Sequence, residues 1–291
     1  MLPTFFIIGA AKAGTTSLYR YLAEHPEIHM SPIKETNFFC ADNGDFRYRT
    51  RIGEAAEYEA LFDSRAACRG ESSNSYSEYP RHRGVPKRIH EAVPDAKLIY
   101  LVRDPIERLK SLYMQAIASA RKDRRFAGEL SVEKVIGDIE DPTNEYICGG
   151  RYMTQIAQYM EVFPRSSLLV VDHADLLRNR FETLSRVFRF LGVDHTFVSA
   201  GITEQHNASA AKRRFTDAYV GLRYSPFKSA IDRLPAGLRA PLVGAAQRTL
   251  SRRPPAPEIS DDDRRRLIEL FAPEVDALRR VTGEQFSTWS M

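Results

Sequence analysis

The 291-residue sequence lacks the features that mark several classes of protein. No stretch approaches the roughly 18 consecutive apolar residues that a membrane-spanning helix needs. The three cysteines, Cys40, Cys68 and Cys148, are odd in number and widely spaced, so they form neither a disulfide framework nor a metal-binding pattern. The seven histidines show no metal-ligand spacing either, and we expect no metal.

The chain also lacks a strong excess of one charge. Its net charge is +4 and its sequence pI is near 8.9. This mild excess suits an anionic ligand but not nucleic acid, because nucleic-acid-binding domains usually combine a pI above about 9 with clustered basic residues. The chain start shows no basic segment and no small-residue cleavage site of a secretory leader. We therefore expect a cytoplasmic protein with no nucleic-acid partner.

Apolar runs alternate with helical patterns along the first two thirds of the chain. The runs typical of buried strands are Phe5–Gly9, 97–102 and 167–171. The helical patterns that follow them are 16–24, 106–120 and 181–191. This alternation predicts an α/β fold with a parallel sheet flanked by helices on both faces. In such sheets, ligands bind at the carboxyl ends of the strands.

The last third of the chain, about 208–291, has a different composition. Its first half is rich in Ala, Arg and Pro and shows no obvious strand. Ser260 then caps a predicted helix that begins with three aspartates and runs toward Pro273. A second helix is predicted to end near Gly283. We therefore predict a single domain, 1–291, with a helical C-terminal cap.

The segment GAAKAGTTS (9–17) joins the first predicted strand to its helix. Gly9 and Gly14 allow a tight turn and a close approach to a ligand. The helix start favours an anion through its free N–H groups and its dipole, and Lys12 adds a full positive charge. Three hydroxyl donors follow, Thr15, Thr16 and Ser17. The segment therefore predicts an anion-binding, P-loop-like turn; a glycine turn without a ligand is the alternative interpretation.

A second anion site is predicted in RDPIERLKSLY (103–113). Arg103 follows the second strand, and Ser111 lies two turns into the next helix. A guanidinium fork and a hydroxyl can bind one phosphate. The alternative interpretation is a surface Arg–Asp pair and a solvated serine. Because both loops belong to one edge of the sheet, two anion sites indicate a nucleotide phosphorylated at two places.

Together these segments resemble the sulfotransferases that use 3′-phosphoadenosine 5′-phosphosulfate (PAPS). The phosphosulfate loop of that family is similar to FFIIGAAKAGTTSLYRYL, and its 3′-phosphate motif is similar to RDPIERLKSLY. The Lys-Glu and Phe-Phe of PIKETNFF (32–39) resemble the carbohydrate branch, which includes heparan sulfotransferases and many bacterial homologues. GGRYMTQIAQYMEVFP, LLVVDHADLL, FRFLGV and the Trp289 ending also fit. The resemblance covers most of the chain and is weakest from 215 to 260.

The resemblance implies a role for each matching position. The residues that would hold the 5′-phosphosulfate are Lys12, Ala13, Gly14, Thr15, Thr16 and Ser17. Those that would hold the 3′-phosphate are Arg103 and Ser111. The catalytic base of the family matches Glu35, with Lys34 beside it. The basic loop that closes over the cofactor falls on 211–215 but lacks its usual glycine. Its candidates are Lys212, Arg213 and Arg214.

Three positions depart from the pattern of the heparan members. Ser72 stands where they have a lysine that helps to bind an anionic sugar, Asn74 replaces the usual Pro or Ala, and Asn37 replaces the histidine often found after Lys-Glu. These departures weaken the expectation of a heparan-like acceptor.

The residues suggest an in-line sulfuryl transfer that requires no metal. An acceptor hydroxyl, or less favourably an amine, must lose a proton as it attacks, and a carboxylate such as Glu35 can take that proton. Lys12 can stabilise the charge that develops on the leaving phosphate. Without the resemblance, Glu35 would be interpreted as a surface glutamate paired with Lys34. Glu71, after an apparent strand end, is a candidate for a second acid or an acceptor contact, and His206 for lining the acceptor site. Tyr152 is a candidate for core or adenine-side packing.

The acceptor class stays open between a carbohydrate, a glycolipid and a metabolite. Residues 219–253 mix apolar and basic side chains, which fits either an interfacial helix pair at a membrane or a cap packed on the core with a solvated basic face. Two other functions are considered. A small-molecule kinase would need Gly-Lys-Ser/Thr at the loop end, and a non-catalytic nucleotide-binding module would not need its base. The high Arg and Ala content favours a bacterial enzyme.

Overall fold

The computed structural model describes most of the chain in detail. The described residues are 1–40, 52–63, 65–120, 136–137, 139, 141, 143–198, 201, 214–215, 241, 249, 251–252 and 257–291. The chain divides into two compact units. The first comprises Met1–Leu109, Asp138–His206 and Asp261–Met291, and the second comprises Lys110–Gly137 and Asn207–Ser260. The single domain over 1–291 stays a prediction. Within the described residues, none of the helices combines the length and apolar character needed to cross a membrane.

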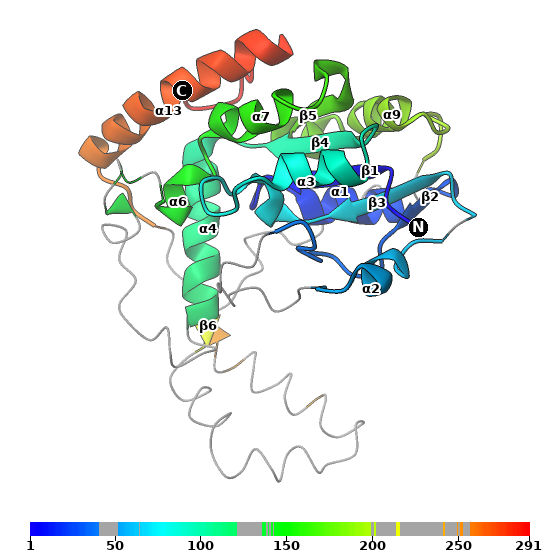
Figure 1. The fold of residues 1–291 in the computed structure, drawn as a ribbon. Helices are drawn as coiled ribbons and strands as arrows, with labels where there is room; N and C mark the ends of the chain where they lie inside the picture. Colours follow the sequence, from blue (N-terminus) through cyan, green and yellow to red (C-terminus); the bar gives the residue numbers. More distant parts are fainter. Residues whose placement is uncertain are drawn as a thin grey trace. The chain divides into compact units, whose positions relative to one another are not determined.

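The first unit is built on a five-stranded sheet (Figure 1). In spatial order its strands are β2 (Ile28–Met30), β3 (Cys68–Ser72), β1 (Phe5–Gly9), β4 (Lys97–Val102) and β5 (Leu168–Asp172). Every neighbouring pair is parallel. The predicted parallel α/β sheet is therefore confirmed, and so are the three predicted strands. Strand β2 was not predicted because it is only three residues long. The strand expected to end before Glu71 is β3, and it continues through Ser72 although it carries Arg, Gly and Glu.

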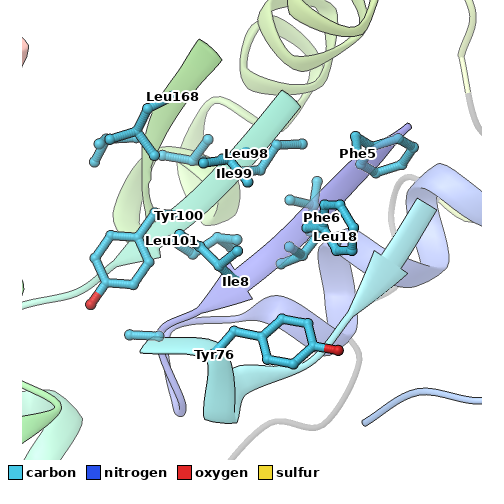
Figure 2. Packing of buried hydrophobic residues seen from close by; sticks show 14 of the residues in the cluster. Phe5, Phe6, Ile8, Leu18, Tyr76, Leu98, Ile99, Tyr100, Leu101 and Leu168 are labelled. Carbon is cyan, nitrogen blue, oxygen red and sulfur yellow. The ribbon is translucent and has the colours of Figure 1, made fainter. Parts of the chain in front are cut away.

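The central strands are apolar on both faces because helices cover both sides of the sheet. All five residues of β1 are buried, and so are the last five residues of β4. Figure 2 shows their side chains packed together with Leu18 of α1 and Leu168 of β5. Each fully buried side chain of this kind contributes about 1.5–3 kcal/mol. This packing fixes where β1 and β4 end, and therefore where the loops that follow them begin.

Helices follow the strands as the sequence predicts. Those on the predicted segments are α1 (Thr15–Ala23), α4 (Pro105–Ala120) and α9 (Arg180–Leu191). The others are α2 (Ala55–Glu59), α3 (Val85–Ala92), α6 (Glu145–Cys148), α7 (Tyr152–Met160), α8 (His173–Arg178) and α13 (Asp261–Thr282). In Figure 1, α13 lies along α7, which in turn contacts α3. Helix α1 packs against the sheet, where it contacts β1 and β2.

The C-terminal helix differs from the sequence prediction. A break before Pro273 was expected, but α13 is one helix with Pro273 inside it. Its apolar side chains at Leu267, Phe271, Val275 and Leu278 are all buried. Beyond the proline, Glu274 accepts a hydrogen bond of 2.8 Å from the backbone N–H of Thr154 in α7. A continuous buried stripe and this contact hold the helix together although proline removes one backbone donor.

The second unit contains a short antiparallel pair that the sequence did not indicate. Strand β6 (Arg214–Phe215) pairs with β7 (Ser251–Arg252). Two residues in each strand are too few for an alternating pattern to be recognised, and the pairing of Arg214 with Arg252 joins residues too far apart in the sequence for a local pattern to reveal it. The expectation of no strand in this region is therefore wrong.

The last residues of the chain lie against the carboxyl ends of β4 and β5. The indole Nε1 of Trp289 donates to both carboxylate oxygens of Asp172, at 3.3 and 3.2 Å. The backbone N–H of Ser290 donates to Asp104 Oδ2 at 2.6 Å. Asp104 also accepts at its other oxygen from the first N–H groups of α4, those of Ile106 and Glu107. The C-terminal segment thus fixes the helix that follows β4.

Replacement of Trp289 by phenylalanine is expected to lower the melting temperature. The ring would keep its stacking on Phe286, but the buried Asp172 carboxylate would lose its indole donor. A lost hydrogen bond to a charged group costs about 1.5–3 kcal/mol. Thermal unfolding of the variant and the parent protein measures the difference, with Phe181→Leu, at a half-exposed position, as the control. Equal melting temperatures for Trp289→Phe and the parent would show that this contact contributes nothing.

Candidate active site

The loop between β1 and α1 has the geometry of an anion-binding turn. Gly14 adopts a left-handed φ of 96° at the N-cap of α1, and no side chain donates or accepts a capping hydrogen bond there. A Cβ on Gly14 would lie 2.9 Å from Cδ2 of His173. Only glycine therefore fits this position, and no side chain covers the N-terminus of α1, whose positive dipole end attracts an anion.

The side chains of the loop divide into buried and partly exposed positions. Ala13, Thr15 and Ser17 are buried, whereas Lys12 and Thr16 are partly exposed. Lys12 also has a left-handed φ of 73°, which is unusual for a residue with a Cβ. Such strain costs about 1–3 kcal/mol and is concentrated at functional sites. Lys12 and Thr16 are thus the loop side chains best placed to meet a ligand.

The two predicted anion sites lie next to each other. Arg103 directly follows β4, and its Nη1 donates to the carbonyl oxygen of Lys12 at 3.4 Å. Its other terminal nitrogen lies 3.8 Å from Glu107 of α4. Burial lowers the pKa of Arg103, and the charge of Glu107 opposes that effect. Ser111, the predicted partner for the same phosphate, is buried within α4.

Two residues beside Arg103 were not assigned to the site from sequence. Tyr152 Oη donates to the carbonyl oxygen of Arg103 at 2.5 Å and accepts from its backbone N–H at 3.2 Å, so it fixes this residue from both sides. Tyr152 is fully buried, which agrees with its predicted core role. His173 follows β5 as Arg103 follows β4. Burial and the Arg103 charge lower the pKa of His173 to about 4, so its ring beside Gly14 is neutral at pH 7. The sequence feature that could have assigned His173 to the site is its position directly after a predicted strand.

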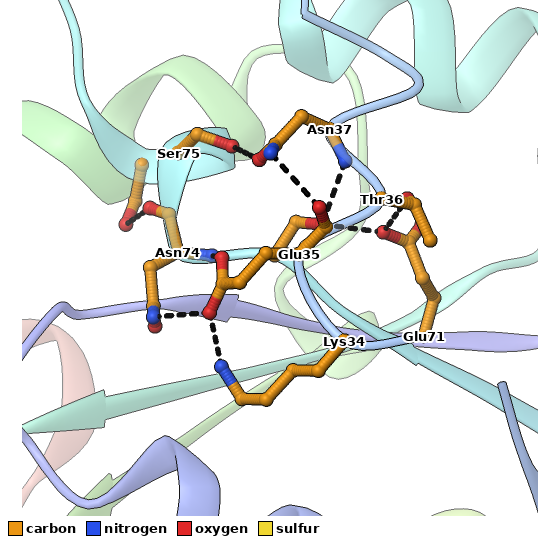
Figure 3. A network of polar contacts seen from close by, with 9 residues as sticks. Lys34, Glu35, Thr36, Asn37, Glu71, Asn74 and Ser75 are labelled. Carbon is orange, nitrogen blue, oxygen red and sulfur yellow. Dashed lines mark hydrogen bonds and ion pairs between the residues drawn. The ribbon is translucent and has the colours of Figure 1, made fainter. Parts of the chain in front are cut away.

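Glu35 lies in the segment after β2 and is held by several donors (Figure 3). Its Oε2 accepts from the backbone N–H of Asn74 at 2.8 Å, and its Oε1 accepts from Asn74 Nδ2 at 2.6 Å. Lys34 forms an ion pair with the same carboxylate. The Glu35 side chain is 30% exposed, so a reactant can still reach it. The backbone of Glu35 has a left-handed φ of 63°.

Glu71 does not fit the predicted acceptor contact. It lies in β3, is completely buried and accepts four hydrogen bonds from hydroxyl groups. No part of its carboxyl group is accessible to an acceptor in this conformation. Ser72, which stands where heparan members have a lysine, is also fully buried. These two positions therefore belong to the interior below Glu35 and do not form an acceptor surface.

Several predicted residues lie outside the described part of the chain. They are His206, Lys212 and Arg213, and most of the segment 219–253. Arg214 is described through its backbone only, which pairs in β6 with Arg252 of β7. Within the described residues, no three His, Cys, Asp or Glu side chains are grouped so that they could hold a metal ion.

The described donors fit a ligand with two separated phosphate-type groups. One anion would meet the uncapped N-terminus of α1 and Lys12, and the other would meet Arg103 at the end of β4. The ring of His173 packs against Gly14, where a Cβ would clash with it, and so borders the same turn. The partly exposed carboxylate of Glu35 belongs to the same unit. This set suits transfer of an anionic group to an acceptor that loses a proton.

Comparisons with known proteins agree with this chemistry. A model of the sulfotransferase family matches residues 3–197. The chain is 24% identical over 286 residues to human heparan sulfate glucosamine 3-O-sulfotransferase 6, covering 98% of this chain and 73% of that protein. The chain covers less of other relatives, for example 55% of a mouse relative and 20% of a Caenorhabditis elegans relative.

Solved structures show the same fold. A sulfotransferase from Alicyclobacillus acidocaldarius is similar over 100% of both chains, with a TM-score of 0.68 and 26% identity. Mouse SULT7A1, solved in complex with PAP, is similar over 97% of this chain and 88% of its own, with a TM-score of 0.52 and 14% identity. The second likeness concerns the fold alone. The predicted P-loop-like fold is thus confirmed.

Proposed function

This chain belongs to the family of PAPS-dependent sulfotransferases, and we propose that it transfers the sulfuryl group to a hydroxyl of a carbohydrate, glycolipid or metabolite. The observation that supports this proposal most is the contact between Arg103 and the Lys12 carbonyl oxygen. It brings together two cationic residues that follow different strands. A nucleotide that carries phosphate groups at both its 3′ and its 5′ positions requires such a pair of cations.

PAPS would supply the sulfuryl group and leave as 3′,5′-adenosine bisphosphate. The start of α1 and Lys12 would hold the 5′ end and stabilise the charge that develops on it. Arg103 would hold the 3′-phosphate. The acceptor hydroxyl forms its new O–S bond as it loses a proton, and Glu35 would accept that proton on its carboxylate. The Lys34 ion pair and the two Asn74 donors keep that carboxylate oriented before the acceptor arrives.

Calorimetric binding of 3′,5′-adenosine bisphosphate is the first test, with 5′-AMP and ATP as comparison ligands. Tight binding of the bisphosphate alone would support both anion sites, whereas a preference for ATP would favour a kinase. We expect Arg103→Ala to weaken bisphosphate binding by about 1.5–3 kcal/mol, the worth of a hydrogen bond to a charged group. This corresponds to roughly 10- to 150-fold in Kd.

The matched control is Arg265→Ala. Arg265 is an exposed arginine of α13 that pairs with Asp262, so its loss removes the same charge from a different surface. Bisphosphate affinity should be unchanged in this variant. If Arg103→Ala also binds the bisphosphate as tightly as the parent protein does, Arg103 does not hold the 3′-phosphate.

The acceptor is proposed from the relatives and the departures together. The human relative is named for sulfation of a heparan glucosamine, which favours a carbohydrate hydroxyl. The buried Ser72, however, offers no cation for an anionic sugar at the position where heparan members have a lysine. Incubation with radiolabelled PAPS and three panels of acceptors, namely sulfated oligosaccharides, neutral sugars with glycolipids, and phenolic metabolites, would identify the class. Transfer to none of them would contradict the proposed acceptor chemistry.

A further inference from the structure

The buried carboxyl group of Glu71 is the centre of a hydroxyl network below Glu35. Its Oε1 accepts from Thr36 Oγ1 at 2.5 Å and from Ser73 Oγ at 2.6 Å. Its Oε2 accepts from Tyr58 Oη at 2.6 Å and from Tyr76 Oη at 3.0 Å. Burial raises the pKa of Glu71, and these four donors oppose the rise. A buried polar network is stable only when its members are satisfied, so these partners depend on one another.

The network reaches Glu35 along two segments of the chain. Thr36 is the next residue after Glu35, and Ser73 is the residue before Asn74, whose N–H and amide bind the Glu35 carboxylate. Ser73 Oγ also accepts from the backbone N–H of Asn37 at 3.1 Å. The two residues that donate to Glu71 Oε1, Thr36 and Ser73, are therefore the chain neighbours of Glu35 and Asn74 (Figure 3).

The segment with Glu35 needs such an anchor because its backbone is strained. Glu35 has a φ of 63° and Asn37 a φ of 53°, although neither is a glycine. Asn37 Nδ2 donates to the carbonyl oxygen of Glu35 at 2.9 Å, and the Glu35 N–H donates to the carbonyl oxygen of Ser72 in β3 at 2.8 Å. Left-handed conformations at residues with a Cβ persist only where the surroundings fix them.

We propose that Glu71 is a positioning residue, which holds the Glu35 carboxylate in its reactive orientation by anchoring Thr36 and Ser73. This inference rests on the proposed role of Glu35 as proton acceptor. Glu71 itself touches neither cofactor nor acceptor, because it is completely buried. The network thus connects the Glu35 segment to the rigid strand β3 and so fixes the position of the Glu35 carboxylate.

Glu71→Gln and Thr36→Val test the anchor from its two ends. The NH2 group of glutamine only donates, so it cannot accept from the two hydroxyls that one carboxylate oxygen of Glu71 binds, and valine keeps the shape of threonine without its donor. We expect kcat to fall by about 10- to 100-fold in each variant, since a misplacement of about 1 Å can cost 10²-fold. The affinity for 3′,5′-adenosine bisphosphate should be unchanged, and Thr36→Ser, which keeps the hydroxyl, should restore kcat.

Tyr58→Phe is the matched structural control. It removes a hydroxyl donor from the same carboxyl group, but Tyr58 lies on α2, which includes neither Thr36 next to Glu35 nor Ser73 next to Asn74. We expect a lower melting temperature with an unchanged kcat. A fall in kcat that follows the fall in melting temperature across Glu71→Gln, Thr36→Val and Tyr58→Phe would overturn the proposal, because the network would then be only structural.

A double-mutant cycle separates this inference from the proposed function. If Glu71 acts through Glu35, adding Glu71→Gln to Glu35→Gln should cause no further loss of kcat, because the oriented group is already gone. If the two variants reduce kcat independently, so that their losses add, Glu71 does not act through Glu35, and the role of Glu35 is unaffected. Normal turnover of Glu35→Gln alone would instead refute the proposed role of Glu35 as proton acceptor, and the absence of any sulfuryl transfer by the parent protein would refute the proposed function.

Nuclear magnetic resonance of the full isotope-labelled chain gives a readout without any acceptor. The backbone amide proton of Asn74 donates to Glu35 Oε2, so its chemical shift reports whether the carboxylate is in place. The Asn74 resonance should move in Thr36→Val and in Glu71→Gln, and it should stay in Tyr58→Phe. An unmoved resonance in Thr36→Val would overturn the proposal even if Glu71→Gln failed to fold.

Discussion

Turnover of a Glu35→Gln variant is expected to fall by about 10²–10⁴-fold, the usual contribution of a positioned proton acceptor. Glutamine has nearly the same shape as glutamate, and its carbonyl oxygen can still accept from Asn74, but it cannot take the acceptor proton. Binding of 3′,5′-adenosine bisphosphate should be unchanged, because the predicted phosphate-binding residues lie in the β1–α1 loop and after β4. Initial rates of sulfuryl transfer and calorimetry on the same preparation measure both quantities.

The matched control for this variant is Glu284→Gln. Glu284 is also a partly exposed glutamate in an ion pair, with Arg186, but it follows α13 and belongs to neither strand end of the site. Its replacement should leave turnover unchanged. A Glu35→Gln protein that transfers the sulfuryl group at the normal rate would remove Glu35 from the mechanism, and the family membership would then need another proton acceptor.

The parts of the fold that were predictable are those whose signal is local. The strands β1 and β4 are long enough and apolar enough to be recognised without knowledge of their neighbours. The loop after β1 carries its two glycines and Lys12 within a single short segment. Because parallel strands place their carboxyl ends at one edge, the proximity of this loop and Arg103 follows from topology alone. The hydrogen bond from Arg103 to Lys12 agrees with that expectation.

The partners of Glu35 were not predictable, because they depend on the extent of β3 and on its pairing in the sheet, which the sequence did not reveal. Asn37 and Asn74 were noted only as departures from the heparan pattern, yet both donate hydrogen bonds to Glu35. Asn74 reaches it because β3 lies between β1 and β2, beside the segment that leaves β2. Glu71 was interpreted as an acceptor contact for the same reason, since its burial depends on strand pairing and not on its own sequence.

Residues with a strained backbone are concentrated at the proposed site. Among the described residues other than glycine, only four have a positive φ: Lys12, Glu35, Asn37 and Phe286. Two of these are the residues proposed for charge stabilisation and proton acceptance, and a third donates to Glu35. Strain of this kind needs compensation from the surroundings. The site is therefore held in a costly conformation by β3 on one side and by Arg103 on the other.

Lys12→Met is expected to lower turnover by about 10²–10³-fold, the cost of removing one preorganised donor from developing charge, or roughly 2.7–4 kcal/mol. Methionine keeps the length of the side chain and removes only its charge. The left-handed backbone should be retained, because Arg103 holds the Lys12 carbonyl oxygen and not its side chain. The fall should be larger in kcat than in bisphosphate affinity, since the charge on the leaving phosphate develops in the transition state.

Lys87→Met, at an exposed position of α3, is the control. Equal losses in kcat and in affinity would show that Lys12 only binds, and an unchanged kcat would exclude it from the reaction.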